Sequence, residues 1–404
     1  MPGPIGSPSN APTMGSDAAL VAIMLPRPAA AAAVAEAWDA GEAVTVLDPA
    51  APPAVRARLL DLLRPTHLLD EKGRRDLPGG VAVAGDTAAV VATSGTTATP
   101  KGVELTVSGL EAMGAGFATA FGSPAADRWL ICLPLHHVAG LAILARARVS
   151  GAGLVVHAGF EIDAVASSPS AERTTLVSLV PTMLHRLLAA DAPMRSFRRI
   201  VTGGAPLPPA VRARATSAGA VVVDAYGLSE TWGGILLDGA PIAGAAVMLG
   251  DNDEVLLRGP MIMRAYRLRA DETGSAFTPD GWLRTGDVGV QDPDGRIRIV
   301  DRRKDLVISG GVNISPRAVE DALADHPEID DVAVVGTPDE EWGERVVAYV
   351  VPRDPRAPVT LADVRAFGRD QLAATHLPRE LVLVDTIPRT DGGKILRREL
   401  RRAT

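Results

Sequence analysis

The sequence is poor in several residue types, and each shortage narrows what the protein can be. A single cysteine, Cys132, leaves no partner for an internal disulfide, which suits a reducing compartment. No apolar run reaches the roughly 18 to 20 residues that a helix needs to cross a bilayer, and the Ala-rich stretch 29–37 lacks the flanks of a signal peptide. We therefore expect a cytoplasmic protein with no membrane span, and a buried thiol at Cys132 because its neighbours are apolar.

Lysine is scarce as well. Of the 41 lysines and arginines only four are lysine, namely Lys72, Lys101, Lys304 and Lys394. Arginine stands almost everywhere that a positive charge suffices, so each lysine is a candidate for a role that requires a compact ammonium group. The net charge of −7 and the lack of a long basic tract argue against a nucleic-acid partner.

A chain of 404 residues exceeds the roughly 250 to 300 residues that one hydrophobic core supports, so we expect at least two domains. Residues 1–16, rich in Pro, Gly and Ser, predict a disordered tail. From there to about residue 250, short and nearly continuous apolar runs alternate with helix-like segments, two of which begin at Pro181 and Pro208. This pattern is typical of an α/β fold in which helices cover both faces of layered sheets.

The pattern changes after Asp251. Short strands with turn signals predict a β-rich subdomain. The residues after Asp301 predict a compact α+β unit, with one helix that begins at Pro316 under a Ser315 cap and another over 360–374. We expect a large domain over residues 17–301, with an abbreviated N-terminal part, and a small mobile lid domain over residues 302–404.

One loop is dense in hydrogen-bond donors. The segment 93–102, TSGTTATPKG, follows an apolar strand and holds five hydroxyls, two glycines and a lysine, which suits a polyphosphate. It is not a Walker A loop, because Pro100 and Gly102 stand where that motif requires glycine and a serine or threonine. Taken alone, a Ser/Thr-rich surface turn would explain the segment as well.

Five further segments follow in a fixed order: 203–206 (GGAP), 225–231 (AYGLSET), 281–287 (GWLRTGD), 301–313 (DRRKDLVISGGVN) and 388–397 (PRTDGGKILR). With the donor-rich loop they resemble the signatures of the adenylate-forming superfamily, which includes acyl-CoA synthetases, peptide-synthetase adenylation domains and firefly luciferase. The resemblance covers nearly everything after residue 17. It implies an enzyme that uses ATP and Mg²⁺ to convert a small carboxylic acid into an acyl-adenylate, and then passes the acyl group to the thiol of coenzyme A.

The resemblance assigns roles around the phosphates. Lys394 is expected to reach the α-phosphate and the carboxylate oxygen and to stabilise the transition state. Without the preceding Thr-Asp-Gly-Gly, it would be interpreted as an exposed lysine in a basic tail. Glu230 is expected to hold Mg²⁺ with Thr97. Ala98 replaces the usual glycine of the phosphate loop, which would stiffen it. The other phosphate-loop candidates are Thr93, Ser94, Gly95, Thr96 and Lys101.

The nucleoside is expected to lie among the other signatures. Asp287 can accept from two vicinal ribose hydroxyls, and Arg302 resembles the family's second ribose contact. Tyr226 is expected to stack on adenine, while the backbone of Gly203 and Gly204 approaches the edge of the base. The remaining members of the predicted ATP site are Ala205, Gly227 and Ser229, the last of which stands where the family has threonine.

The same resemblance predicts a conformational exchange between two half-reactions. After adenylation the small domain would pivot at Lys304 and would present Ser309, Gly310 and Gly311 to the coenzyme A tunnel. His137, at the end of a strand, would guard the carboxylate pocket and rotate to admit the thiol. Its neighbour His136 is more simply a packed or solvated residue.

The acid itself depends on fewer residues. Short chains with the Pro-Leu-x-His-x-x-Gly segment (134–140) resemble the o-succinylbenzoate:CoA ligases of menaquinone synthesis, in which a basic residue nine positions after the histidine meets the distal carboxylate of the substrate. That residue is Arg146 here, and with His137 and Gly204 it forms the predicted substrate set. The alternative is a surface arginine beside Arg148 on an Ala-rich helix.

Several alternatives stay open from the sequence. The substrate could be another aryl, fatty or short acid, and the acceptor could be a carrier protein loaded by a stand-alone adenylation enzyme. A nucleotide-binding module without catalysis is disfavoured by the presence of Lys394, Glu230 and Asp287, and a luciferase-like oxygenase shares the motifs. The oligomeric state is not determined by the sequence, and a homodimer is compatible with it.

Overall fold

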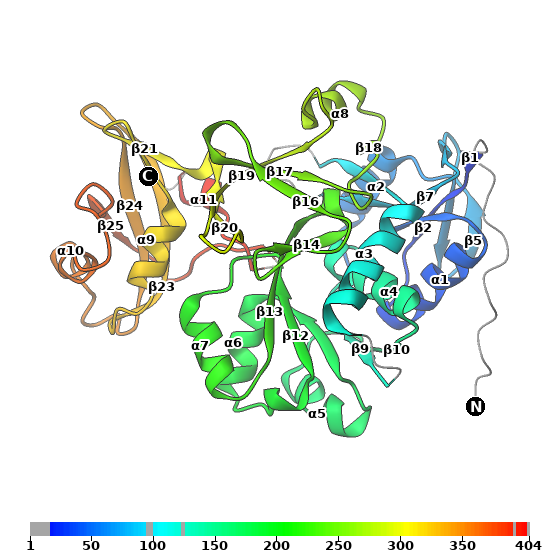
Figure 1. Ribbon diagram of the computed structural model, residues 1–404, viewed down its shortest axis with the longest axis horizontal. Coiled ribbons are helices and arrows are strands. Elements are labelled where there is room, and N and C mark those ends of the chain that lie inside the picture. Colours follow the sequence, from blue (N-terminus) through cyan, green and yellow to red (C-terminus); the bar gives the residue numbers. More distant parts are fainter. Residues whose placement is uncertain (1–16, 94–99, 123–125, 391–392, 402–404) are drawn as a thin grey trace.

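The computed structural model describes residues 17–93, 100–122, 126–390 and 393–401. In that part of the chain, two seven-stranded sheets and a four-stranded sheet form a large unit, and a five-stranded sheet forms a smaller unit at one end (Figure 1). The predicted α/β class, with a β-rich subdomain and an α+β C-terminal unit, is confirmed. No helix within these residues is long and apolar enough to span a bilayer.

The first seven-stranded sheet has the order β18-β8-β7-β3-β2-β4-β5. Strands β2, β3 and β4 are parallel, and β18 joins the edge from far along the chain, with Tyr266 opposite Val103. A separate pair, β1 and β6, is antiparallel. The elements are β1 (Asp17–Ala18), β2 (Leu20–Ile23), α1 (Arg27–Asp39), β3 (Ala43–Val46), α2 (Pro53–Leu63), β4 (His67–Asp70), β5 (Gly73–Asp76), β6 (Val83–Ala84), β7 (Thr87–Ala92), β8 (Gly102–Thr106) and β18 (Ala265–Tyr266).

The second seven-stranded sheet has the order β10-β9-β11-β12-β13-β14-β15, parallel up to β13. Because β11, β12 and β13 are parallel, their carboxyl ends meet at one edge, where ligands of open α/β sheets bind. The elements are α3 (Val107–Phe121), β9 (Arg128–Ile131), α4 (Val138–Ser150), β10 (Gly153–Val156), α5 (Ile162–Ala171), β11 (Leu176–Leu179), α6 (Pro181–Ala189), η1 (Met194–Ser196), β12 (Arg199–Gly203), α7 (Pro209–Ser217), β13 (Val222–Leu228), η2 (Ser229–Thr231), β14 (Gly233–Leu237) and β15 (Ala240–Pro241).

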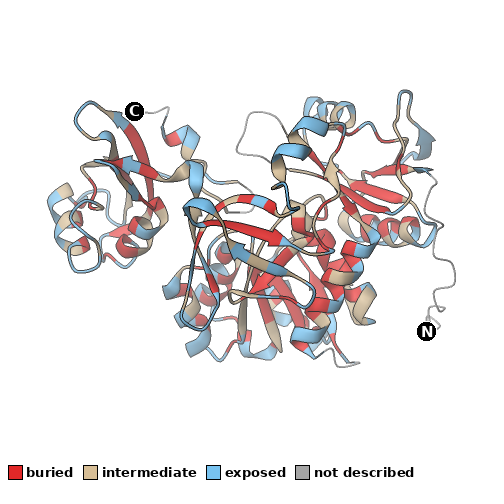
Figure 2. Cartoon of the chain, turned by 45° about the horizontal axis from the view of Figure 1, so that its top comes forward, coloured by how far each residue is buried: buried red, intermediate tan, exposed pale blue. Residues whose placement is uncertain are grey.

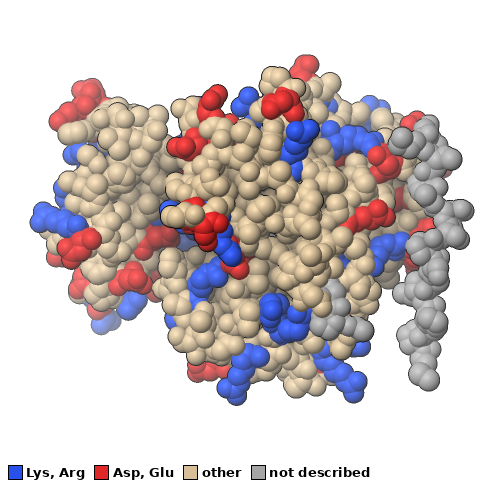
Figure 3. Space-filling view, in the orientation of Figure 1, with Lys and Arg blue, Asp and Glu red and all other residues tan. Residues whose placement is uncertain are grey.

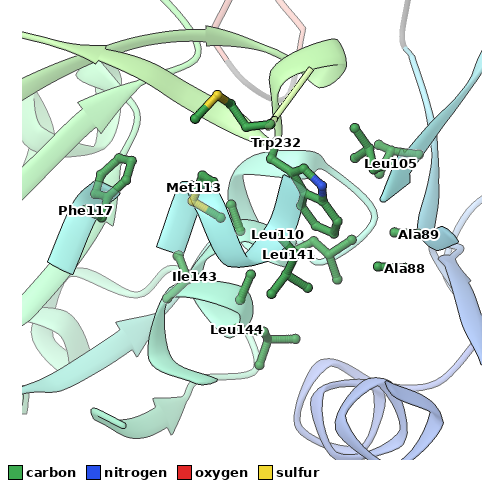
Figure 4. Packing of buried hydrophobic residues seen from close by; sticks show 14 of the residues in the cluster. Ala88, Ala89, Leu105, Leu110, Met113, Phe117, Leu141, Ile143, Leu144 and Trp232 are labelled. Carbon is green, nitrogen blue, oxygen red and sulfur yellow. The ribbon is translucent and has the colours of Figure 1, made fainter. Parts of the chain in front are cut away.

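Trp232 lies at the centre of the main hydrophobic cluster, beside residues of α3, α4 and the first sheet (Figure 4). Its side chain is fully buried, and its indole N–H donates to the backbone oxygen of Thr106 at 3.1 Å. Cys132 is 1% exposed in a second cluster, as predicted, and burial raises the pKa of its thiol to about 12. The thiol is therefore a core residue and not a nucleophile.

The β-rich subdomain predicted after Asp251 is an antiparallel sheet of order β16-β17-β19-β20. Two of its strands, β19 and β20, place Asp287 directly opposite Arg302. The elements are β16 (Ala246–Leu249), η3 (Asp251–Asp253), β17 (Glu254–Arg258), α8 (Ala270–Ala276), β19 (Leu283–Gln291) and β20 (Ile297–Arg302).

The C-terminal unit has buried clusters of its own, all formed by residues from Val307 onward (Figure 2). As predicted, Ser315 caps a helix, since its Oγ accepts from the amide of Ala318. The helix predicted over 360–374 ends at Gly368, where a Cβ would lie 2.9 Å from Leu377 Cδ2. The elements are η4 (Arg303–Asp305), β21 (Val307–Ser309), β22 (Val312–Ile314), α9 (Pro316–Leu323), β23 (Ile329–Asp339), β24 (Gly343–Pro352), α10 (Leu361–Gly368), β25 (Glu380–Leu383) and α11 (Arg397–Leu400).

Candidate active site

Glycines shape the edge of the second sheet where β12 and β13 end. A Cβ on Gly203 would lie 2.9 Å from the backbone oxygen of Ala225, and one on Gly227 would lie 1.6 Å from that of Gly233. Gly204 has a φ of +81°, a left-handed conformation that favours glycine. The neighbouring strands therefore require these glycines, whether or not a nucleotide base approaches them.

Asp287 stands at the centre of a polar cluster next to this edge. Its Oδ1 lies 2.6 Å from Nε of Arg302, and the hydroxyl of Tyr226 donates to its Oδ2 at 2.6 Å. Burial raises the pKa of Asp287, and the charge of Arg302 opposes that rise. Each carboxylate oxygen has a second lone pair, so the group can still accept two hydrogen bonds from a diol.

Lys394 approaches the same cluster from the C-terminal unit. Burial lowers the pKa of its ammonium group, and the nearby charges of Arg302 and Lys304 lower it further while Asp287 opposes them. Within the described ranges Lys394 forms no ion pair. The preceding residue, Gly393, packs against α6, since a Cβ there would lie 3.2 Å from Thr182 Oγ1. The site thus gathers positive charge that an anionic ligand would stabilise.

Glu230 is held by a short 3₁₀ turn, η2, that follows β13. Thr231 fixes the turn, because its hydroxyl accepts from the amide of Leu228 at 2.9 Å and donates to the backbone oxygen of Gly233 at 2.6 Å. The hydroxyl of Tyr266 donates to Oε1 of Glu230 at 2.8 Å. Burial raises the pKa of Tyr266, so this hydroxyl keeps its proton and stays a donor.

Lys101 belongs to the same cluster. Its ammonium group lies 4.3 Å from the ring centroid of Tyr266 and 2.7 Å from Oε2 of Glu272, which also pairs with Arg269. The amide of Thr93 donates to the backbone oxygen of Lys101 at 2.8 Å and closes the base of the loop. Tyr266 and Glu272 lie outside all six signatures, so neither was predicted. Ser94, Gly95, Thr96, Thr97 and Ala98, for which roles were predicted, lie outside the described residues.

Arg146 lies inside helix α4 and is 4% exposed, so the alternative of a surface arginine is wrong. By contrast, Arg148 is exposed and pairs with Asp39. The guanidinium carbon of Arg146 lies 3.6 Å from the ring centroid of Phe117, and Nη1 lies 3.4 Å from the hydroxyl oxygen of Ser178. Ser178 was missed by the sequence analysis; a polar residue within the buried run Leu176–Leu179 was the available signal.

Arg146 has no carboxylate partner among the described residues, and its Nε has no hydrogen-bond partner there. Burial lowers the pKa of the guanidinium to about 9, which still leaves it charged at neutral pH. A buried charge without a counter-ion is unfavourable. The arrangement therefore favours an anionic group from outside the chain.

His137 is the N-cap residue of α4, with its ring centroid 4.5 Å from that of His136. It precedes the helix that carries Arg146, so one element positions both residues of the predicted substrate set. Of the other predicted ATP-site residues, Ala205 and Ser229 are partly exposed next to β12 and in η2.

The predicted hinge and coenzyme A loop lie at the start of the C-terminal unit. Lys304 is in η4, and burial lowers the pKa of its ammonium group. Strands β21 and β22 form a hairpin with Ser309 opposite Val312. Between them, Gly310 and Gly311 have φ values of +58° and +78°, as a tight two-residue turn requires.

A carboxylate before the predicted hinge also contacts a helix after it. Oδ2 of Asp301, in β20, accepts from the hydroxyl of Ser315 at 2.8 Å and from the amide of Arg317 at 3.0 Å. The donors are the N-cap residue and the second residue of α9. The carboxylate therefore completes the cap of that helix from the other side of Lys304.

The donor set around Glu230 fits Mg²⁺ better than a metal bound by the protein alone. No group of three or more His, Cys, Asp or Glu side chains that could hold a metal occurs among the described residues. Mg²⁺ commonly binds one or two carboxylates together with substrate phosphates and water. Glu230 offers one carboxylate, and its partner Tyr266 also contacts Lys101, near the end of a segment whose sequence is rich in hydroxyls.

Comparison with known proteins identifies the family of the chain. Residues 78–267 match the AMP-binding enzyme family, and residues 318–394 match the AMP-binding enzyme C-terminal domain. The 2-succinylbenzoate–CoA ligase of Bacillus pumilus is 34% identical over 338 residues, which cover 78% of this chain and 68% of that protein. A feruloyl-CoA synthase of Amycolatopsis is also 34% identical, over 81% of this chain and 71% of the synthase.

Solved structures show the same fold. The o-succinylbenzoate CoA synthetase of Bacillus subtilis, in complex with its acyl-adenylate intermediate, superposes with a TM-score of 0.85 at 28% identity. The match covers 95% of this chain and 88% of that one. The same synthetase has been solved with ATP and a magnesium ion, with a TM-score of 0.84.

The chain belongs to the AMP-binding enzyme family. Within that family it is an AMP-forming acyl-CoA ligase, which uses ATP, Mg²⁺ and coenzyme A, as the ordered signatures predicted.

Proposed function

We propose that this protein ligates an aromatic dicarboxylic acid to coenzyme A through an acyl-adenylate, and that the acid is o-succinylbenzoate. The observation that carries the proposal is the buried, charged Arg146 with no carboxylate partner among the described residues. A second carboxylate on the substrate would supply the missing anion. The names of the relatives from Bacillus support the same substrate.

The surroundings of Arg146 fit an aromatic acid. Phe117 stacks on the guanidinium from α3, and Trp129 lies 5.7 Å from it by ring centroid. Stacking on aromatic faces restrains the planar guanidinium, so its edge faces a fixed direction. Ser178 adds a hydroxyl beside Nη1 that could share the substrate's distal carboxylate.

In the first half-reaction the substrate carboxylate attacks the α-phosphate of ATP and pyrophosphate leaves. Negative charge builds at one phosphorus, and we assign its stabilisation to the ammonium group of Lys394. Its position beside Asp287 and Arg302, and its lack of an ion pair within the described ranges, support that role. A preorganised charge that meets the transition state is worth about 2.7–4 kcal/mol in comparable enzymes.

The nucleoside would bind at the edge formed by β12, β13 and β19. In this proposal Asp287 accepts from the ribose hydroxyls, Arg302 holds that carboxylate in place, and Tyr226 stacks on adenine while it orients Asp287 through its hydroxyl. Gly203 and Gly204 leave the base edge unobstructed. Ala205, Gly227 and Ser229 complete the wall of the pocket.

Mg²⁺, when bound, would neutralise the β- and γ-phosphates. Glu230 would hold it, with Tyr266 fixing the direction of the carboxylate. Thr97 is the predicted second ligand and lies outside the described residues, as do the neighbouring phosphate-loop residues Ser94, Gly95 and Thr96. Lys101 is held by Glu272 here, and we assign it to anchoring the loop as well as to the phosphates.

In the second half-reaction the thiol of coenzyme A attacks the acyl carbonyl and AMP leaves. We propose that residues 302–404 act as a mobile lid on the large domain 17–301, pivoting at Lys304. The pivot would withdraw Lys394 and bring the turn at Ser309, Gly310 and Gly311 to the tunnel. His137, at the start of α4, would turn aside to admit the thiol.

A second candidate is a ligase for an aryl monocarboxylate, favoured by the 34% identity to a feruloyl-CoA synthase. Ferulate has no second carboxylate to meet Arg146. A stand-alone enzyme that loads a carrier protein shares the adenylation chemistry and differs only in its thiol.

A panel of acids would distinguish these candidates. We expect kcat/KM, measured by pyrophosphate release, to be at least about tenfold higher for o-succinylbenzoate than for ferulate, benzoate or a short fatty acid. An acid without a second carboxylate leaves the buried Arg146 unpaired, and a site built to bind a polar group discriminates strongly against substrates that lack it. Mass spectrometry should detect the coenzyme A ester of the same acid. Faster turnover of ferulate would support the second candidate and contradict the first.

A further inference from the structure

The segment that carries Lys394 is a short hairpin, residues 388–396, called here the catalytic hairpin. The amide of Leu396 donates to the backbone oxygen of Pro388 at 2.8 Å, and the amide of Thr390 donates to that of Lys394 at 2.9 Å. Gly393 has a φ of +79°, which suits glycine. Residues 391–392 lie outside the described part of the chain. The backbone of the hairpin therefore sets where the lysine stem begins.

Arg389 ties this hairpin to the sheet of the C-terminal unit. Its Nη2 lies 2.7 and 3.0 Å from the two carboxylate oxygens of Asp331 in β23. Its Nη1 donates to the backbone oxygen of Gly393 at 3.1 Å. Gly393 directly precedes Lys394, so one guanidinium joins the residue next to the lysine to a strand of the core.

Asp331 is itself held in one direction. The pairing of β23 with β24 shifts register between Ile329 and Asp331. The amide of Val332 donates to Oδ1 of Asp331 at 2.9 Å. The carboxylate that receives Arg389 is therefore fixed by the strand and is not a freely rotating surface acid.

The far end of the hairpin has a second anchor of a different kind. Nη2 of Arg397 lies 2.8 Å from both carboxylate oxygens of Glu320, which also accepts from the amide of Val334. This pair is nearly buried, and breaking it would leave an uncompensated charge and endanger the fold. The side chains of Arg389 and Asp331 are 31% and 36% exposed, so their pair contributes little to stability.

We propose that Arg389, through Asp331 and Gly393, is the positioning residue that aims Lys394 at the reacting phosphate. The inference rests on the role proposed above for Lys394. A lysine stem has four flexible carbons, so the ammonium group is directed only if the backbone beneath it is fixed. A displacement of about 1 Å of a catalytic group can lower the rate about 10²-fold.

The test separates the two half-reactions. In Arg389→Ala we expect the single-turnover rate constant of acyl-adenylate formation, measured by pyrophosphate release, to fall about 10- to 100-fold. The KM for ATP should stay within about twofold of wild type. Thioester formation from supplied acyl-adenylate should keep its wild-type rate. Asp331→Ala should show the same split, and the double variant should be no worse than either single one, because both remove one interaction.

Arg345→Ala is the matched control. Arg345 pairs with Glu380 at 2.8 Å in the same unit, with exposures of 38% and 35%, and its ion pairs among the described residues involve no residue of the catalytic hairpin. Adenylation by this variant should stay at the wild-type rate. Arg389→Lys, which can meet Asp331 but cannot donate from a planar fork to Gly393 as well, should recover part of the lost rate.

Two results would overturn the inference: adenylation at the wild-type rate in Arg389→Ala, or an equal fall of both half-reactions. Lys394→Ala in the same assays isolates the underlying assumption. If Lys394→Ala spares adenylation, the proposed role of the lysine is wrong. If it abolishes adenylation selectively while Arg389→Ala does nothing, only the positioning role is wrong.

Discussion

The guanidinium of Arg146 stacks on the ring of Phe117 at 3.6 Å, and within the described ranges no carboxylate comes within ion-pair distance of it. Two helices, α3 and α4, thus enclose a positive charge that the folded chain does not neutralise. Acidic and basic side chains elsewhere are interspersed over the surface, as the face in Figure 3 shows. The isolated charge is therefore a property of the surroundings of Arg146 and not of an overall excess of basic residues.

Replacing this charge should stabilise the ligand-free protein. Burial lowers the pKa of Arg146 to about 9, well below the ordinary value of an arginine, so the folded protein binds this proton less tightly than the unfolded chain. The charge is therefore destabilising at every pH below about 9, and the penalty shrinks as the pH rises from there. We expect Arg146→Met to raise the free energy of unfolding at pH 7.5 by about 1 kcal/mol, as measured by urea denaturation.

The same variant should lose the proposed substrate. We expect kcat/KM for o-succinylbenzoate to fall about 10²-fold or more, because a carboxylate would meet an apolar pocket, while ferulate should be used no worse than before. Arg148→Met, which changes an exposed arginine two positions along the same helix, is the control. An unchanged preference in Arg146→Met would remove the main support for a dicarboxylate.

Tyr266 should tune the response to magnesium. Its hydroxyl fixes one oxygen of Glu230, and loss of such an outer partner typically weakens metal affinity about 10- to 100-fold. Tyr266→Phe should therefore raise the Mg²⁺ concentration needed for half-maximal adenylation by about tenfold. A direct binding titration with Mn²⁺ in the presence of ATP should show the same shift. Tyr349→Phe, which removes another buried hydroxyl within the C-terminal unit, should leave the response unchanged.

The rate of adenylation should fall at a lower alkaline pH than it would with a lysine of ordinary pKa. Burial lowers the pKa of Lys394 below the ordinary value of a lysine, and the role proposed for it needs the ammonium form, so the rate should fall as the pH rises through that lowered pKa. Bound ATP is anionic and raises the pKa again. The alkaline limb of kcat/KM for ATP, which reports the free enzyme, should therefore lie at lower pH than that of kcat.

Lys394→Arg gives the control for this pH profile. An arginine stays charged over the whole range, so the slower variant should lack the alkaline limb. Persistence of the limb in pyrophosphate release by Lys394→Arg would assign it to another group.

We expect Asp287 to bind ATP through the hydroxyls of its ribose. We expect Asp287→Asn to raise the KM for ATP at least about tenfold, since an amide cannot replace a charged acceptor. With 2′-deoxy-ATP the effect of the substitution should be smaller, because one of its hydrogen bonds is already missing. Asp292→Asn, a change of a solvent-facing carboxylate after β19, is the control. Equal effects with both nucleotides would exclude a contact with the 2′-hydroxyl.

Much of the fold could be predicted because the signals are local. Proline at Pro181 marks the start of α6, Ser315 caps α9 through a residue three positions away, and continuous apolar runs mark the parallel strands. The helix predicted over 360–374 was too long. It ends at Gly368, where a Cβ would lie 2.9 Å from Leu377 Cδ2, and helical periodicity does not record such a tertiary approach.

The sequence could identify a candidate site residue only where that residue lies within one of the signatures. Asp287 and Arg302 were found separately, and strand pairing then placed them together. Partners that come from distant segments were missed, because no local pattern records them. Tyr266 meets Glu230 across 36 positions, and Ser178 meets Arg146 across 32.

The contact between Asp301 and the start of α9 has a further consequence. Asp301 precedes Lys304 and the helix follows it, so any rotation at that point separates the carboxylate from the amide of Arg317. In the proposed pivot, water would then occupy the vacated lone pairs, and the first helical turn would loosen until the contact forms again. Turnover would thereby raise the deuterium uptake of the Arg317 amide, a peptide group that has no part in the proposed chemistry.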